Sequence, residues 1–248
     1  MKLLLINPNT TQAVTDAALA AARAAARLGT ELHAVTGHFG PAVIGSRAET
    51  ALAAHSVLQL ASEHARACDA VLLAVSLDTG LWACRELLPM PVVGMTEAGL
   101  LMGCTLATRI GLVTYGARMG PLYRELAESY GLATRLAGIA TLDVLPQQTF
   151  SQPLQVHAAV LAAVQQLVQH NQAEAVLLAG AAMAGLAVTL QPQVTVPLLD
   201  GVACAVALAE ARLGLQLPKA RSGSVSPTGG REVHGVSAAL TALFAERP

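Results

Sequence analysis

The segment Val75-Ser-Leu-Asp-Thr-Gly80 contains the side chains best suited to chemistry. It closes an apolar run that has the length and composition of a buried strand. Ser76 carries a hydroxyl that can attack or orient a substrate, and Asp78 carries a carboxyl that can act as a general acid or base. A closed cleft that excludes water would raise the pKa of this carboxyl. Asp78 and Ser76 are therefore the candidate catalytic residues.

Each of these residues also has a structural interpretation. An aspartate just before a helix commonly caps it, and a helix is predicted to begin near Leu81, so capping and catalysis are equally supported for Asp78. No histidine is placed by sequence pattern to activate Ser76, which favours substrate orientation over nucleophilic attack. Thr79 follows at the same predicted strand end and is a candidate substrate-binding residue.

The segment around these residues occurs twice in the chain. Ala70-Val-Leu-Leu-Ala-Val75 is repeated as Ala175-Val-Leu-Leu-Ala-Gly180, 105 residues later, counted from position 70 to position 175. The Gly-Leu pair at 80–81 returns at 185–186, and the Pro-led run at 91–94 is matched by 197–200. A strand, a glycine-containing turn, a helix start and a second strand are thus repeated. This repeat predicts two similar lobes that each contribute one turn to a shared cleft.

The second copy of the turn offers groups that bind rather than react. Backbone N–H groups of Gly180, Ala181 and Ala182 at a predicted helix start can bind an anion or a developing oxyanion. Thr114 and Tyr115 follow the strand that opens the second lobe, and Thr114 is a candidate carboxylate ligand. These five residues complete the predicted substrate site.

Strand-like and helix-like runs alternate along the whole chain. This alternation predicts an α/β fold in which each lobe is a parallel sheet flanked by helices. A pseudo-twofold axis would relate the lobes, and the site would lie between them at the carboxyl ends of the strands. The predicted strands are 3–6, 31–35, 70–75, 91–95, 109–114, 137–144, 175–179 and 196–199, and the predicted helices are 11–28, 46–67, 81–88, 121–130, 153–170 and 237–245.

Composition excludes several classes of function. The chain has 248 residues, of which 54% are hydrophobic and 12% charged, and its net charge of −1 predicts neither a nucleic-acid nor a membrane-surface partner. No apolar run reaches the roughly 18 residues of a spanning helix, and the short first run does not resemble a signal peptide. The four cysteines form no CxxC pair and have no histidine at metal-ligand spacing, so we expect no metal and a cytoplasmic location. The apolar excess predicts a homo-oligomer.

Two further segments have mainly structural interpretations. Asp200 precedes a predicted helix, where capping is the expected role. The glycine- and serine-rich stretch 220–231 either forms a lid that brings Arg221 or Arg231 to an anionic substrate, or is a solvated surface loop. The surface loop is favoured.

Several segments together resemble a known group of enzymes. They are Ile6-Asn-Pro-Asn-Thr10, Gly40-Pro-Ala42, Ile110-Gly-Leu-Val-Thr114, 179–186 and 196–202. In order and spacing, from Lys2 to about Leu215, they are similar to the hydantoin and allantoin racemase branch of the aspartate/glutamate/hydantoin racemase superfamily. The resemblance implies a two-lobed enzyme without cofactor, with residues 1–98 plus 216–248 in one lobe and residues 99–215 in the other. It also implies that Asn7 and Asn9 hold the amide or carboxylate of a substrate, although Asn-Pro-Asn is in addition a strong turn signal.

The resemblance also implies a catalytic pair that this chain lacks. In that superfamily two cysteines face each other across the cleft, and the aligned positions here are Val75 and Gly180. The internal repeat pairs the same two positions. Neither side chain can exchange a proton, so racemisation by paired thiols is not expected. Cys68, Cys84, Cys104 and Cys204 are interpreted as small buried hydrophobes.

Three functions follow from these observations. The favoured one is a cofactor-independent enzyme on a small carboxylate, cyclic amide or lactam, with chemistry changed to ring-opening hydrolysis or a lyase step through a stabilised enolate or oxyanion. The first alternative is a racemase or epimerase that uses other groups, with Asp78 on one face and water or Tyr115 on the other. The second alternative is a non-catalytic protein that binds a small molecule.

Overall fold

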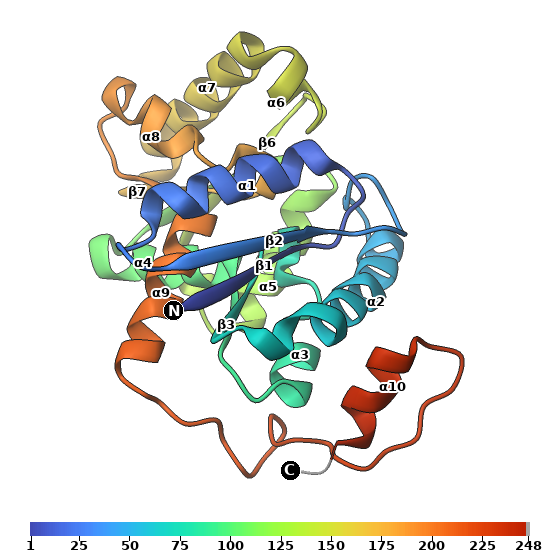
Figure 1. Cartoon of the computed structure of the whole chain (residues 1–248). Coiled ribbons are helices and arrows are strands. Elements are labelled where there is room, and N and C mark those ends of the chain that lie inside the picture. The colour runs from blue at the N-terminus through green and yellow to red at the C-terminus, as the bar shows by residue number, and fades with distance from the viewer. Residues whose placement is uncertain (247–248) are drawn as a thin grey trace.

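Two parallel four-stranded sheets with the same strand order form the centre of the molecule. The structure is a computed structural model, and it describes residues 1–246 (Figure 1). The first sheet has the order β2-β1-β3-β4, formed by Glu31–Thr36, Lys2–Asn7, Ala70–Leu73 and Val92–Gly94. The second has the order β6-β5-β7-β8, formed by Leu136–Leu142, Ile110–Tyr115, Ala175–Leu178 and Leu198–Asp200. The predicted α/β fold of two similar lobes is confirmed.

Helices cover the sheets, and several of them lie outside the predicted helix ranges. One of these spans Met95–Leu106, where Glu97 is the single charged residue. A helix that is apolar around its circumference is buried on most sides and lacks the amphipathic pattern by which helices are recognised. The helices are α1 (Gln12–Ala25), α2 (Arg47–His64), α3 (Leu81–Leu87), α4 (Met95–Leu106), α5 (Met119–Ser129), α6 (Gln148–Ser151), α7 (Pro153–Asn171), α8 (Leu186–Leu190), α9 (Gly201–Gly214) and α10 (Ala238–Ala245).

β3 and β7 are apolar at every position, and β1 and β5 are largely apolar, because both faces of each sheet are buried. In β1, Leu3 and Leu5 pack into the core that the two lobes share. Leu4 and Ile6 point to the opposite face and pack in a second core beneath α2 and α3. This alternation is the two-residue period of a strand. One face of the first sheet therefore packs against α1, α9 and the shared core, and the other packs against α2 and α3.

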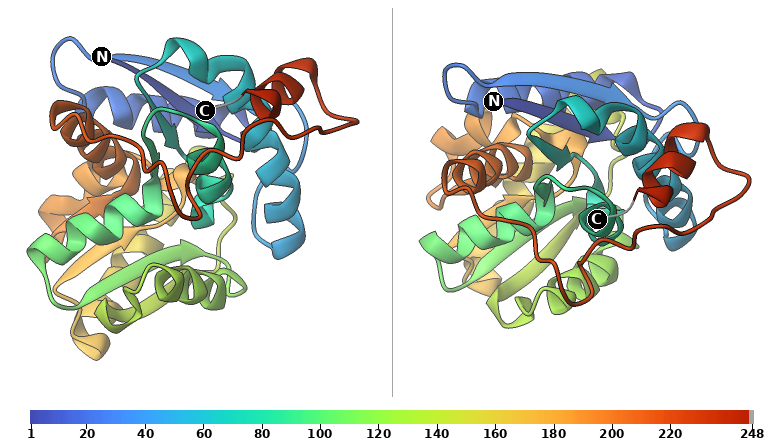
Figure 2. Two further views of the ribbon diagram at one scale, coloured as in Figure 1. Left: turned by 90° about the horizontal axis from the view of Figure 1, so that it is seen from below. Right: turned by 60° about the horizontal axis from the view of Figure 1, so that its bottom comes forward.

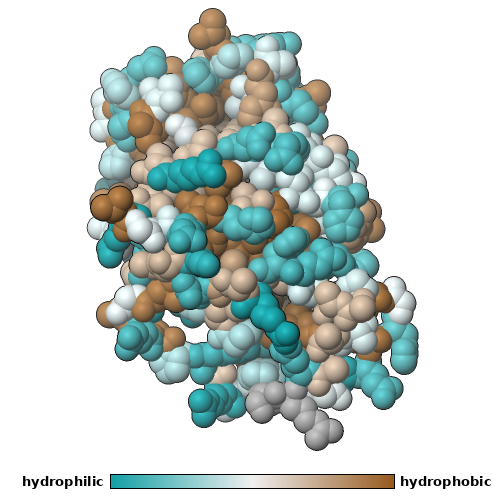
Figure 3. Space-filling model, in the orientation of Figure 1, coloured by the Kyte–Doolittle hydropathy of each residue, from teal (hydrophilic) through white to brown (hydrophobic). Residues whose placement is uncertain are grey.

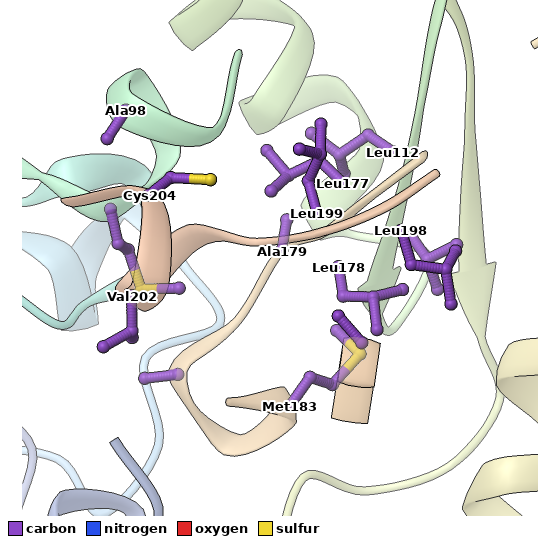
Figure 4. Packing of buried hydrophobic residues seen from close by; sticks show 14 of the residues in the cluster. Ala98, Leu112, Leu177, Leu178, Ala179, Met183, Leu198, Leu199, Val202 and Cys204 are labelled. Atoms are coloured by element: carbon purple, nitrogen blue, oxygen red, sulfur yellow. The ribbon is translucent and has the colours of Figure 1, made fainter. Parts of the chain in front are cut away.

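The lobes exchange a helix. α4 follows the last strand of the first sheet but packs on β5, β7 and β8 of the second. α9 follows the last strand of the second sheet but packs on β3 and β4 of the first, and the two helices also contact each other. Figure 4 shows Ala98 of α4 and Cys204 of α9 in one apolar cluster with Leu177 and Leu199 of the second sheet. The lobes consequently share a continuous core.

The chain returns to the first lobe after α9. It crosses this lobe in an extended path and ends in α10, which packs on α2 (Figure 2). Arg66 and Glu246 form an ion pair of 2.5 Å at this contact. On the face drawn in Figure 3, hydrophilic side chains are interspersed with apolar ones. Within residues 1–246 we find no helix with the length and apolar character that crossing a membrane requires.

Substitution of a glycine tests the contact between α4 and α9. Gly201 begins α9, and a Cβ added there would lie 2.7 Å from the carbonyl oxygen of Met95, which begins α4. Because backbone cannot move aside as a side-chain tip can, we expect Gly201→Ala to lower the free energy of unfolding by about 2 kcal/mol in urea titrations. Gly214→Ala at the other end of α9 is the control, since no atom lies within 4 Å of its added Cβ. Equal unfolding free energies for the two variants would contradict this packing.

Candidate active site

A pocket of about 200 Å³ lies between the lobes, where strands of both sheets end. The first lobe contributes Val75 and Ser76, which follow β3. The second lobe contributes Tyr115 at the end of β5 and the turn that follows β7. The sequence-predicted site residues that line this pocket are Asn9, Val75, Ser76, Thr114, Tyr115, Gly180, Ala181 and Ala182.

The two repeated turns have matching backbone hydrogen bonds. The N–H of Asp78 donates to the carbonyl of Val75 at 3.3 Å, and the N–H of Met183 donates to the carbonyl of Gly180 at 2.9 Å. Each turn then ends in a left-handed glycine that precedes a short helix, with φ of +80° before α3 and +86° before α8. The internal repeat in the sequence is thus a repeat of backbone geometry.

The positions that the resemblance assigns to cysteines both line the pocket. Val75 has ordinary extended backbone, with φ of −144°. Gly180 has φ of +144°, a conformation that residues with a side chain rarely adopt. A Cβ built there would lie 3.5 Å from the ring of Tyr115. The turn of the second lobe therefore has a backbone suited to glycine, and neither position holds a group that exchanges protons.

The two asparagines predicted to bind substrate have different surroundings. Asn9 lines the pocket, and its Oδ1 accepts hydrogen bonds from the Asn7 side chain at 3.0 Å and from the Thr11 N–H at 2.9 Å. Its own Nδ2 donates to no acceptor in the described part of the chain, so it is available to a ligand. Asn7 is fully buried and donates to Asn9, to the Thr11 carbonyl and to Thr15. The structure gives Asn7 the task of holding the loop that presents Asn9.

Asp78 lies beneath the pocket rather than in it. It is 3% exposed, and its carboxylate accepts the N–H groups of Thr96 at 2.9 Å and Glu97 at 2.7 Å. The Tyr130 hydroxyl donates to it at 2.8 Å. Asp78 therefore caps α4, a helix 18 residues further along the chain, rather than α3. Burial raises the pKa of Asp78 to about 6, although these three hydrogen bonds act to lower it.

Gly94 makes room for this cap. A Cβ at Gly94 would lie 2.4 Å from the carboxyl carbon of Asp78. In the second lobe the equivalent strand end is Asp200, which caps its own helix by accepting the N–H groups of Val202 at 2.8 Å and Ala203 at 3.2 Å. The predicted capping role of Asp200 is confirmed. In each lobe an aspartate carboxylate thus caps the helix that follows the last strand of the sheet. It comes from the turn after β3 in the first lobe and from the end of β8 in the second.

The hydroxyl groups of Thr79 and Tyr115 both form hydrogen bonds within the protein. Thr79 is buried outside the pocket, and its hydroxyl donates to the Ser76 carbonyl at 3.1 Å, which stabilises the turn. The ring of Tyr115 lines the pocket, while its hydroxyl lies 2.5 Å from that of Thr149. Burial raises the pKa of Tyr115 to about 12. At neutral pH this hydroxyl is therefore protonated and can donate, but cannot act as a base.

Sequence reasoning missed Arg118 and the apolar wall of the pocket. Arg118 carries the only charge among the described residues that line the pocket. It lies three residues after Tyr115, just before α5, so its distance from the strand end is a signal that could have identified it. Ile44 and Val144 come from loops, and Phe150 comes from the one-turn helix α6. They give the pocket a largely apolar wall beside one cation.

Other predicted features lie elsewhere. Among the described residues no cysteine lines the pocket. Cys84 and Cys204 are buried in the cores as predicted, whereas Cys68 and Cys104 are only half-buried, so the predicted burial is wrong for these two. The 220–231 stretch does not reach the pocket and borders cavities on the first lobe instead. Among the described residues no group of three or more histidine, cysteine or carboxylate side chains is arranged to hold a metal ion.

Comparison with known proteins identifies the family. The family model described as Asp/Glu/Hydantoin racemase matches residues 3–209. The chain belongs to the Asp/Glu/hydantoin racemase family. It is 34% identical over 211 residues to a hydantoin racemase of Pseudomonas sp. (strain NS671), covering 85% of each chain. A hydantoin racemase of Paenarthrobacter aurescens is 34% identical over 229 residues, which are 90% of this chain and 96% of that protein.

Solved structures of this family have the same fold. An allantoin racemase from Klebsiella pneumoniae superimposes with a TM-score of 0.93 and 30% identity over 97% of this chain and 99% of its own. An allantoin racemase from Pseudomonas fluorescens gives 0.92 and 29% over 95% and 100%. These relatives are racemases, and they favour isomerisation over the hydrolase or lyase chemistry expected from the missing cysteines.

Titration of Asp78 gives a testable pH dependence of stability. Its folded-state pKa of about 6 lies above the ordinary value of an aspartate, so the folded state holds this proton more tightly than the unfolded state. The free energy of unfolding should therefore fall as pH rises from about 4 to about 6. Asp78→Asn should reduce the change between pH 4.5 and 7.5 by about 2 kcal/mol, measured by urea unfolding. Asp16→Asn, at an exposed position of α1, should retain the wild-type slope. A wild-type slope in Asp78→Asn would contradict the raised pKa.

Proposed function

We propose that this protein is an isomerase that exchanges the proton on a carbon beside a carbonyl group in a small chiral carboxylate or cyclic amide, without paired thiols. The observation that supports it is that one pocket is lined by both repeated turns, so a bound ligand contacts both lobes at once. The family relatives named hydantoin racemase and allantoin racemase support a cyclic amide as the substrate class.

The residues of the pocket suit the stabilisation of an enolate. When a base removes the proton, the electron pair of the C–H bond moves onto the carbonyl oxygen, which becomes negatively charged. Arg118, the free amide N–H groups of Asn9 and the hydroxyl of Thr114 are among the pocket donors able to stabilise this charge. In the proposed mechanism the N–H groups of Gly180, Ala181 and Ala182 add to them from the second lobe. Stabilising this intermediate lowers the barrier to proton loss on one face and return on the other.

Because no cysteine, histidine or carboxylate is among the described residues that line the pocket, we assign proton transfer to neutral hydroxyl groups and water. Ser76 and Tyr115 line the pocket from opposite lobes. Because the high pKa of Tyr115 keeps it protonated, we assign it as a donor on one face. Ser76 would orient a water that accepts the proton on the other face, and solvent would carry that proton back to the oxygen of Tyr115, so that both groups are restored after each turnover. Asp78 is assigned the task of fixing the turn that carries Ser76, because its oxygens are occupied by α4 and Tyr130.

The apolar wall has a role in the same reaction. Ile44, Val144 and Phe150 would hold the substituent of the chiral carbon and exclude water from the enolate. Exclusion of water strengthens each hydrogen bond to the developing charge. This arrangement favours a substrate that is polar at the ring and apolar at the substituent.

One observation favours a second candidate, a binding protein without turnover. The described residues that line the pocket include no cysteine, histidine, aspartate or glutamate. These are the side chains that most often transfer protons at neutral pH. A protein of this kind would bind the same class of ligand and leave it unchanged.

Solvent exchange distinguishes the candidates. The protein is incubated in D₂O with one enantiomer of 5-benzylhydantoin, and the C5 proton is followed by NMR while optical rotation is recorded. We expect loss of the C5 proton together with loss of rotation, faster than in a sample without protein. A new ring-opened product would show hydrolysis instead. Saturable binding with neither exchange nor product would support the binding protein and overturn the isomerase.

Variants locate the reaction in the pocket. Arg118→Gln removes the charge that holds the anionic intermediate, and we expect kcat/KM to fall about 10-fold to 100-fold. Ser76→Ala should lower kcat with little change in KM, because the hydroxyl acts on the proton rather than on binding. Arg124→Gln is the matched control, since Arg124 lies on the same helix as the pocket edge but is exposed outside it. Equal loss in Arg118→Gln and Arg124→Gln would show that the pocket is not the site.

A further inference from the structure

A second pocket, of about 350 Å³, lies at the C-terminal end of α3. The segment that follows α9 forms one side of it, and Figure 2 shows this segment crossing the first lobe on its way to α10. It shares no lining residue with the pocket between the lobes. The two cavities are therefore separate sites.

Three cations from different parts of the chain line this second pocket. Arg85 comes from α3, Arg212 from α9 and Lys219 from the segment after α9, and no carboxylate side chain is among the described lining residues. Arg85 is already neutralised, because its guanidinium makes two hydrogen bonds to Glu97, at 2.9 and 2.5 Å. Arg212 and Lys219 make no ion pair with a carboxylate in the described part of the chain, so these two charges have no direct counter-ion.

Arg212 is the less satisfied of these two. It is half-buried, and within residues 1–246 its guanidinium N–H groups have no hydrogen-bond acceptor. Burial lowers the pKa of Arg212, and repulsion from Arg85 lowers it further, although attraction from Glu97 opposes this. An anion bound beside Arg212 would accept hydrogen bonds in place of the water that burial removes, and its negative charge would offset the repulsion from Arg85.

Lys219 is held in position with one donor to spare. Its ammonium donates to the carbonyls of Glu86 at 2.7 Å and Leu88 at 3.0 Å, at the end of α3. An ammonium has three N–H groups, so the third remains available. Glu86, the acid that attracts Lys219, does not line this pocket, but it lines a neighbouring cavity that Lys219 also borders. Because Lys219 is already fixed, binding an anion would cost it little side-chain entropy.

We propose that this pocket binds a phosphate monoester, with the phosphate between Arg212 and Lys219. A phosphate monoester carries close to two negative charges at neutral pH, which match the two unbalanced cations, whereas a carboxylate carries one. Arginine presents a planar fork of donors to phosphate, and lysine adds a point charge. Trp82, Met90 and Leu217 form an apolar wall beside the cations, and this wall would take the organic group of the ester.

Calorimetric titration with phenyl phosphate at pH 7.5 and constant ionic strength tests the site. We expect saturable binding that is tighter than that of inorganic phosphate, because of the apolar wall, and tighter than that of benzoate, because of charge. Arg212→Gln and Lys219→Gln should each weaken it about 10-fold or more, and Lys219→Arg should retain most of it. Thermal unfolding verifies that each variant is folded.

Two matched variants show whether the ligand binds elsewhere. Arg124→Gln removes an exposed arginine outside both pockets and should bind phenyl phosphate as the wild type does. Arg118→Gln should also bind it normally, because Arg118 belongs to the pocket between the lobes. The proposal is overturned by any of three results: no saturable binding, wild-type affinity in folded Arg212→Gln, or loss of binding in Arg118→Gln.

Discussion

Two helices begin inside this protein, where the lobes meet, and their first N–H groups need acceptors that solvent does not supply. Asp200 satisfies those of α9 from the adjacent strand end. The equivalent strand end before α4 is Gly94, and the carboxylate comes instead from Asp78 in the turn after β3. Because Asp78 joins that turn to α4, it also fixes the backbone of Ser76, and the candidate site depends on this connection.

The same constraint determines which chemistry the pocket can perform. The one carboxyl group in the first turn is committed to backbone N–H groups and Tyr130, and the turn of the second lobe ends in a glycine with positive φ. A single arginine therefore supplies all the side-chain charge of the described lining. Stabilisation of an anionic intermediate is the chemistry that such a pocket supports, while proton transfer falls to hydroxyl groups and water.

Local sequence predicts the repeated features well because they depend on short-range rules. The apolar run at 70–75 and its copy at 175–180 predicted two buried strands, and the structure places Val75 and Gly180 in one pocket. The role of Asp78 depends on a tertiary contact with Thr96, so it could not be predicted from the residues adjacent to Asp78 in the sequence. The bounds of α4 were not predicted for a related reason, since a helix buried on most sides shows no amphipathic period.

The exchange of α4 and α9 has a consequence for how the chain folds. Each sheet is completed by a helix that belongs, in sequence, to the other half of the molecule. Neither half can close its apolar face until the other has formed, so the lobes are not independent folding units. Such long-range dependence gives high contact order and a single cooperative transition. A gene fragment that encodes one lobe alone would leave an uncovered sheet face and yield an aggregating chain.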